Sequence, residues 1–214
     1  GGVDGGANSV YIAEKEINLD IALRLRRKVE DGGARAIMTR SGDYGLGLSD
    51  RIDRVRYISD LNARVDMINN SGADMFVSIH ANASKNPSAR GTIAFYSDSH
   101  PHNREIAYIF QTLFNTSAFE YNGIYYRSHH APQNGGYYLL VNAKVPGVLI
   151  ETGFITNSAD LALLKSERYR QYVADTISAG ITKYLQVRAE LPDAKGAELY
   201  TEEEQAADFE HDTK

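Results

Sequence analysis

Residues Ala73–Ala83 read ADMFVSIHANA, and this stretch decides the fold that we expect for the chain. Met75–Ile79 is an apolar run of the length and composition of a buried strand. His80 follows at the end of that run, and small and polar residues come after it. In open α/β sheets, ligands bind beyond the carboxyl ends of the strands. The position of His80 therefore predicts a functional role if the neighbouring segments build such a sheet.

Amphipathic helical patterns lie on both sides of this stretch. In Glu14–Glu30, apolar residues recur every four positions, and Gly32-Gly33 ends the pattern. Arg54–Asn70 repeats the pattern directly before the strand. Further helices are expected at His102–Asn115, from Asn157 or Ser158 to Lys165, and at Ser166–Val187.

Short apolar runs between these helices predict strands. Besides Asp74–His80, we expect strands at Ala34–Thr39, Thr92–Tyr96, Tyr138–Val141 and Val148–Ile150. Ser41–Asp53 and residues 117–137 are expected to be irregular. Strands that alternate with helices of ten or more residues predict an α/β domain with a mixed, largely parallel sheet and helices on both faces.

Composition and charge narrow the class of protein. The chain has 214 residues, 43% of them hydrophobic, and no apolar run near the roughly 20 residues that cross a bilayer. It contains no cysteine, which excludes disulfides, thiolate zinc sites and cysteine nucleophiles. Nine acids and two lysines fall in Ala189–Lys214, so the rest of the chain is close to neutral. We therefore expect one folded domain at 1–187, an acidic and loosely attached tail at 188–214, and no nucleic-acid partner.

Three ionisable residues occupy places where this architecture builds sites. Glu14 opens the first helix, His80 ends one strand, and Glu151 follows the buried strand Val148–Ile150. Imidazole and carboxylate are zinc ligands, and a carboxylate that does not bind the metal can act as a general base. Each residue also has a structural explanation. Glu14 can simply favour the helix dipole, and His80 can be a hydrogen-bonded structural residue. Glu151 is harder to explain in this way, because burial of an unpaired carboxylate is costly.

Several linked motifs resemble one enzyme family. In order along the chain they are GGVDGGA, AEKEINL, ARAIMTR, ADMFVSIHANA, RGTIAFY and GYYLLVNAKVPGVLIETGFITN. From Gly1 to about Leu185 the chain resembles the zinc-dependent N-acetylmuramoyl-L-alanine amidases (Amidase_3) of bacterial cell walls. The resemblance implies a six-stranded α/β sheet, zinc binding by Glu14 and His80, and Glu151 as the catalytic acid/base.

The resemblance also implies a third zinc ligand. In the family, the opening motif is a strand that ends Asp-Pro-Gly-His-Gly-Gly, and its histidine binds the metal. The present sequence starts at what resembles the Gly-Gly of that motif, so the first strand of the sheet and the third ligand are expected upstream of Gly1 and are absent from this sequence. His129 and His130, in the loop before GGYYLL, are an alternative source of a metal donor, whereas His100, His102 and His211 are expected to be solvated.

The same resemblance implies roles for further residues. Asn82, Tyr138 and Leu140 are expected to contact substrate, although Asn82 can instead hold its loop and Leu140 can belong to the core. Arg64 is expected to be an ion-paired tether between helix and sheet. The glycines of the opening segment are expected to let backbone approach the metal and the substrate closely.

The function implied is hydrolysis of the amide between N-acetylmuramic acid and the L-alanine of the stem peptide. Peptidoglycan is the implied substrate, with a possible activating protein partner and an extracytoplasmic location in cell wall, periplasm or forespore intermembrane space. The insertion Ser41–Ser59 resembles that of the spore-cortex enzymes, which act on the way to muramic-δ-lactam.

Two alternatives of other classes stay open at this point. One is an inactive cell-wall binding or regulatory module of the same fold, which a zinc assay would separate from the enzyme. The other is a zinc carboxypeptidase, which would need a residue such as Arg90 or Arg127 to hold a terminal carboxylate. The products released from peptidoglycan distinguish these reactions.

Overall fold

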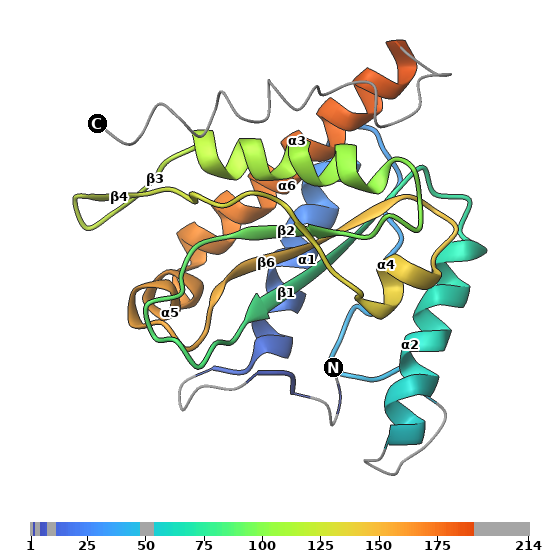
Figure 1. Cartoon of the computed structure of the whole chain (residues 1–214), viewed down its shortest axis with the longest axis horizontal. Helices are drawn as coiled ribbons and strands as arrows, with labels where there is room; N and C mark the ends of the chain where they lie inside the picture. The colour runs from blue at the N-terminus through green and yellow to red at the C-terminus, as the bar shows by residue number, and fades with distance from the viewer. Residues whose placement is uncertain (1, 3–4, 8–11, 48–53, 191–214) are drawn as a thin grey trace.

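Helices and short strands alternate along the chain in the computed structural model, which describes residues 2, 5–7, 12–47 and 54–190 (Figure 1). The helices are α1 (Glu14–Asp31), α2 (Arg54–Asn69), α3 (Asn103–Thr116), α4 (Tyr138–Asn142), α5 (Ser158–Lys165) and α6 (Glu167–Glu190). The strands are β1 (Phe76–Asn82), β2 (Ile93–Tyr96), β3 (Phe119–Tyr121), β4 (Ile124–Tyr126), β5 (Gln133–Asn134) and β6 (Gly147–Phe154).

The main sheet has the strand order β1-β6-β2-β5. β1 is parallel to β6 and β2 is parallel to β5, whereas β2 runs antiparallel to β6. The remaining two strands, β3 and β4, form a separate antiparallel hairpin. The predicted α/β class and mixed sheet are therefore confirmed, but the main sheet of the described residues has four strands, fewer than the five that remain of a six-stranded sheet without its first strand.

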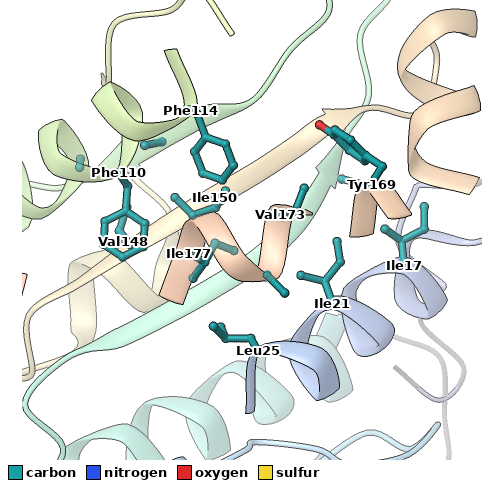
Figure 2. Close-up of a cluster of buried hydrophobic side chains, with 14 of the residues drawn as sticks. Ile17, Ile21, Leu25, Phe110, Phe114, Val148, Ile150, Tyr169, Val173 and Ile177 are labelled. Atoms are coloured by element: carbon teal, nitrogen blue, oxygen red, sulfur yellow. The ribbon is translucent and has the colours of Figure 1, made fainter. Parts of the chain in front are cut away.

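Side-chain alternation along β6 divides the core into two clusters. Val148 and Ile150 point into the larger cluster, which α1, α3 and α6 cover, as Figure 2 shows for its central side chains. Leu149 points to the other face and packs with Leu140 of α4 in a smaller cluster. Every residue of β6 is buried, as expected for a central strand with helices on both sides.

Two of the predicted strands are wrong. Ala34–Thr39 forms no strand and pairs with none of the described strands, and Ile37 within it is 45% exposed. A strand exists only through pairing, so β-propensity alone does not make one. Tyr138–Val141 belongs to α4. Its apolar run fits a buried helical turn as well as a buried strand, and periodicity does not separate these over four residues.

The other helices follow the sequence prediction to within a few residues. Asn157 caps α5 by accepting hydrogen bonds from the backbone N–H groups of Ala159 and Asp160 at 3.0 and 3.1 Å. α6 continues to Glu190, past the predicted domain end at 187, and residues 191–214 of the predicted tail lie outside the described residues. Gly1 and residues 48–53 also lie outside them. Within the described part, no helix combines the length and apolarity that crossing a bilayer requires.

Candidate active site

Glu14, His80 and Glu151 come together at one edge of the sheet, as the sequence predicted. His80 of β1 is the register partner of Glu151 on the neighbouring strand β6. Glu14 is the first residue of α1, and its Oε1 lies 2.8 Å from His80 Nδ1. Two details of the prediction are wrong. β1 continues to Asn82 and β6 continues to Phe154, so His80 and Glu151 lie within their strands and not at their ends.

Hydrogen bonds surround the Glu14 carboxylate. Its Oε2 accepts the backbone N–H of Ala7 at 2.7 Å, and its Oε1 accepts the Asn18 amide at 3.1 Å and the Ala81 N–H at 3.3 Å. Burial opposes ionisation of Glu14, but the bonds to His80 and to these donors outweigh it and lower its pKa to about 2. Glu14 is therefore a buried, charged and oriented group at neutral pH, and not simply an acid that favours the helix dipole.

The opening glycines bring backbone against this carboxylate. Gly6 has a φ of +66°, and a Cβ at this position would lie 2.2 Å from Glu14 Oε2. Only glycine fits so close to the carboxylate with this backbone conformation. Backbone thus lies close to Glu14 at Gly6, whereas its close approach to the metal and the substrate stays a prediction and Gly1 lies outside the described residues.

Glu151 differs from Glu14 in its surroundings. It is 6% exposed, and its Oε2 has no hydrogen-bond partner. Burial raises its pKa to about 7, with the His80 imidazole acting against this and the Glu14 charge adding to it. Burial and the charge of Glu151 also raise the pKa of the Tyr137 phenol to about 12. A carboxyl group that exchanges its proton near neutral pH is suited to general acid/base catalysis.

His80 connects the two carboxylates. Burial works to lower its pKa, but the hydrogen bond to Glu14 and the charges of Glu151 and Glu14 prevail and raise it. The side chain is 43% exposed, so the imidazole is accessible from solvent. Its backbone carbonyl accepts the Thr152 hydroxyl at 2.9 Å, which holds β1 against β6 beside the site.

The donor set partly fits a zinc ion. Tetrahedral zinc with bonds of about 2.0–2.2 Å holds adjacent donor atoms about 3.3 Å apart. Glu14 Oε1 and His80 Nδ1 face each other at 2.8 Å, so a separation increased by about half an ångström would accommodate the ion between them. Among the residues that the structure describes, no group of three His, Asp or Glu side chains is arranged around a common metal position. Glu14 and His80 therefore fit as two ligands of a larger set.

The alternative histidine donors do not complete this set. His130 Nε2 bonds the backbone carbonyl of Arg90 at 2.7 Å, and its own carbonyl accepts the Asn115 amide at 2.8 Å. His129 is exposed. The loop that carries both residues is held against α3 and the segment before β2, so neither is positioned as a donor beside Glu14.

The expected substrate-contacting residues have different surroundings. Leu140 is fully buried with Leu149 in the smaller core cluster, so its side chain does not reach substrate and that expectation is wrong. Asn82 Oδ1 accepts the Ala83 N–H at 2.8 Å, which supports the loop-holding alternative and leaves its amide nitrogen for other contacts. The Tyr138 hydroxyl donates to an amide oxygen of α2 at 2.6 Å. The contacts of Asn82 and Tyr138 with substrate stay predictions.

Arg64 forms the predicted ion pair, but it ties α2 to a segment outside the sheet and not to the sheet itself. Its guanidinium bonds Asp60 Oδ2 at 2.6 Å and Thr39 Oγ1 at 2.7 Å, so it links α2 to the segment after α1. Asn18 is a site neighbour that the sequence analysis did not single out. The helical spacing of Glu14 and Asn18 places them on one face of α1, and this is the signal that points to Asn18.

Comparison with known proteins agrees with this geometry. Residues 1–183 match the family described as Amidase_3, N-acetylmuramoyl-L-alanine amidase. The germination-specific N-acetylmuramoyl-L-alanine amidase of Bacillus subtilis is 33% identical over 90% of this chain and 79% of its own length. The CwlD amidase of Clostridioides difficile, solved in complex with the GerS lipoprotein, superposes with a TM-score of 0.76 at 32% identity, covering 87% of this chain and 94% of that one. The amidase AmiC2 of Nostoc punctiforme gives a TM-score of 0.72 at 29% identity, with 87% and 92% covered.

Proposed function

The chain belongs to the Amidase_3 family, and on that premise we propose that Glu151 is its catalytic acid/base and that Glu14 and His80 bind the zinc ion. Membership makes the protein an N-acetylmuramoyl-L-alanine amidase, a hydrolase of peptidoglycan. It favours the amidase reaction over the carboxypeptidase, and the zinc content and the products released from peptidoglycan test the inactive binding module. One observation carries the proposal: Glu151 has a buried carboxyl oxygen without a partner, beside the paired Glu14 and His80.

The reaction follows from the protonation states of these groups. Glu151, with a pKa of about 7, accepts a proton from the attacking water and then gives it to the nitrogen of the leaving L-alanine amine. A bound zinc ion would polarise the scissile carbonyl and lower the pKa of water. Glu14 and His80 hold their donor atoms towards each other, and the bonds from Ala7, Asn18 and Ala81 keep Glu14 ionised for that task.

Substitution of the two carboxylates separates their roles. Glu151→Gln is expected to lower turnover of peptidoglycan by at least about a hundredfold and to leave the zinc content unchanged. Glu14→Gln is the matched control, because it is expected to lower both the turnover of peptidoglycan and the zinc content. The measurements are the release of free stem peptide with a new L-alanine amine, and the metal content of the purified protein. Normal turnover in Glu151→Gln would refute the role of Glu151.

The spore cortex is the substrate that we propose within this class. The support is the 33% identity to the germination-specific amidase of Bacillus subtilis and the likeness to the CwlD amidase. Expression of this chain in a spore former that lacks its own germination amidase is expected to restore muramic-δ-lactam to the cortex. Hydrolysis of vegetative peptidoglycan without that restoration would contradict the cortex assignment and leave the amidase activity intact.

Location and partner follow from the same relatives. A substrate in the cell wall requires the enzyme to act outside the cytoplasm. Because the CwlD amidase was solved with a lipoprotein bound, we propose that a lipoprotein of that kind also binds this chain. Co-purification with such a lipoprotein from sporulating cells, compared with vegetative cells, tests this.

A further inference from the structure

A second cluster of ionisable side chains lies at the start of α3. Glu105 is 1% exposed, and neither oxygen of its carboxyl group accepts a hydrogen bond. His102 precedes α3, and its Nδ1 is also buried without a hydrogen-bond partner. The two residues are three positions apart, which places them on the same side of the helix. The sequence analysis expected His102 to be solvated, and this is wrong because its side chain is only 15% exposed.

A buried carboxyl group without partners must be compensated. Its ionised form is costly in a low-dielectric environment unless a cation or several donors lie beside it. Burial raises the pKa of Glu105, and the charge of Arg188 on α6 acts against this. The compensating group at short range is therefore either a proton or a second cation.

The distance between the two unpartnered atoms distinguishes these possibilities. His102 Nδ1 and Glu105 Oε2 are 3.4 Å apart. This separation is longer than the roughly 2.7–3.2 Å of an N–H···O hydrogen bond. It agrees with the separation of about 3.3–3.4 Å between adjacent ligands of a tetrahedral zinc ion. The geometry thus suits an ion between the two atoms better than a shared proton.

We propose that His102 Nδ1 and Glu105 Oε2 form a second metal site, which binds a divalent transition-metal ion such as Zn²⁺. Imidazole and carboxylate donors suit this class of ion. Burial, Arg188 and His100 lower the pKa of His102, and a metal ion binds the neutral form of an imidazole.

His100 stands beside the pair. Its ring centroid lies 5.5 Å from that of His102, and its Nδ1 accepts the His102 backbone N–H at 3.3 Å. Over the described part of the chain, no set of three such donors is already arranged around one position. Two protein ligands, with no third donor in place among the described residues, therefore predict weak binding.

This site is separate from the candidate active site. The neighbouring Asn103 accepts the backbone N–H of Gly147, the first residue of β6, at 2.7 Å. Glu151 lies four residues further along the same strand, a distance of about 13 Å at roughly 3.3 Å per residue. The two proposed metal positions therefore lie at different points along β6, and the second does not depend on the function proposed for the first.

Zinc titration in a background without active-site ligands tests the proposal. In the double variant Glu14→Gln/His80→Gln, isothermal titration with ZnCl₂ is expected to show one equivalent bound, and Zn²⁺ is expected to raise the melting temperature. Addition of Glu105→Gln or His102→Gln is expected to weaken binding by at least about tenfold and to remove the thermal shift. His129→Gln, which replaces an exposed histidine, is the matched control and is expected to change neither.

Two outcomes would overturn the proposal. One is the absence of zinc binding in the double-variant background. The other is equal zinc binding with and without Glu105→Gln, which would make Glu105 a buried protonated acid and no ligand. Circular dichroism of each variant verifies folding, and His102→Gln supplies the second line of evidence if Glu105→Gln does not fold.

Discussion

Replacement of Glu151 by glutamine is expected to make the metal-free protein more stable at high pH. The folded state holds the proton of Glu151 more tightly than the unfolded chain, because burial raises its pKa from 4.5 to about 7. The unfolded state therefore binds fewer protons than the folded state in this range, and the free energy of unfolding falls as pH rises from 4.5 through 7. Glutamine has a similar shape and does not ionise, so the free energy of unfolding of the variant does not fall with pH for this reason.

The magnitude follows from the difference between the two pKa values. At about 1.4 kcal/mol per pK unit, the rise from 4.5 to about 7 corresponds to roughly 3 kcal/mol lost by the wild type between pH 4.5 and pH 8. His80, whose pKa is raised, also contributes stability that is lost as pH rises above its ordinary 6.5. The wild type and Glu151→Gln both lose this contribution of His80. The difference between their free energies of unfolding therefore measures the effect of Glu151 and its coupling to His80.

Urea unfolding with a chelator present, at pH 4.5, 6, 7 and 8, measures the effect. Glu14→Gln is the matched control, because the contribution of Glu14 to stability changes with pH in the opposite direction to that of Glu151. The pKa of Glu14 is lowered from 4.5 to about 2, so its ionisation contributes stability that is present above pH 4.5 and is lost as pH falls towards 2. Glu14→Gln is thus expected to destabilise the protein throughout pH 5–8. If the difference between wild type and Glu151→Gln does not change with pH, the carboxyl group is not in the buried environment described.

Three further perturbations follow from the contacts. Gly6→Ala is expected to abolish peptidoglycan hydrolysis, because its Cβ would meet the Glu14 carboxylate. Gly72 has a similar φ of +65° but open space around it, so Gly72→Ala is the control. It is expected to lower the free energy of unfolding in urea by about 1–2 kcal/mol and to keep activity. Asn18→Ala removes a donor to Glu14 and is expected to weaken zinc binding about 10–100-fold in a competition titration; unchanged affinity would mean that Asn18 does not orient Glu14. Asp160→Ala leaves two backbone N–H groups without their acceptor and is expected to lower the free energy of unfolding by about 2–4 kcal/mol. Asp160→Asn retains an acceptor oxygen and is expected to lower it by less. Equal decreases for the two variants in urea unfolding would contradict this explanation.

Periodicity was sufficient for the long elements of the fold. Four-residue spacing of apolar side chains located α1 and α2 closely, because burial of one face determines both the pattern and the helix. It failed for Ala34–Thr39 and for Tyr138–Val141. The first segment has strand composition but no described strand beside it, and the second is too short for its spacing to separate helix from strand.

The sequence was sufficient to predict which residues form the site, but not the hydrogen bonds around each of them. His80 and Glu151 both follow apolar strand residues, and a parallel pairing of the two strands is sufficient to bring them together. The sequence does not reveal that Glu14 is surrounded by donors whereas Glu151 has an unpartnered oxygen, because those contacts depend on Ala7, Asn18 and Ala81, which are close in space and not in one pattern.

This difference between two carboxylates explains how one small site can supply two chemical roles. Glu14 accepts several hydrogen bonds, so it is ionised at any physiological pH and suited to hold a cation. Glu151 lacks such donors on Oε2 and is buried, so it exchanges its proton near pH 7 and is suited to move one. The two roles are set by the number of donors that reach each carboxylate and not by the residue type. A variant that gave Glu151 a new donor would therefore be expected to lower its pKa and to shift the acidic limb of the pH–rate profile to lower pH, without a change in zinc content.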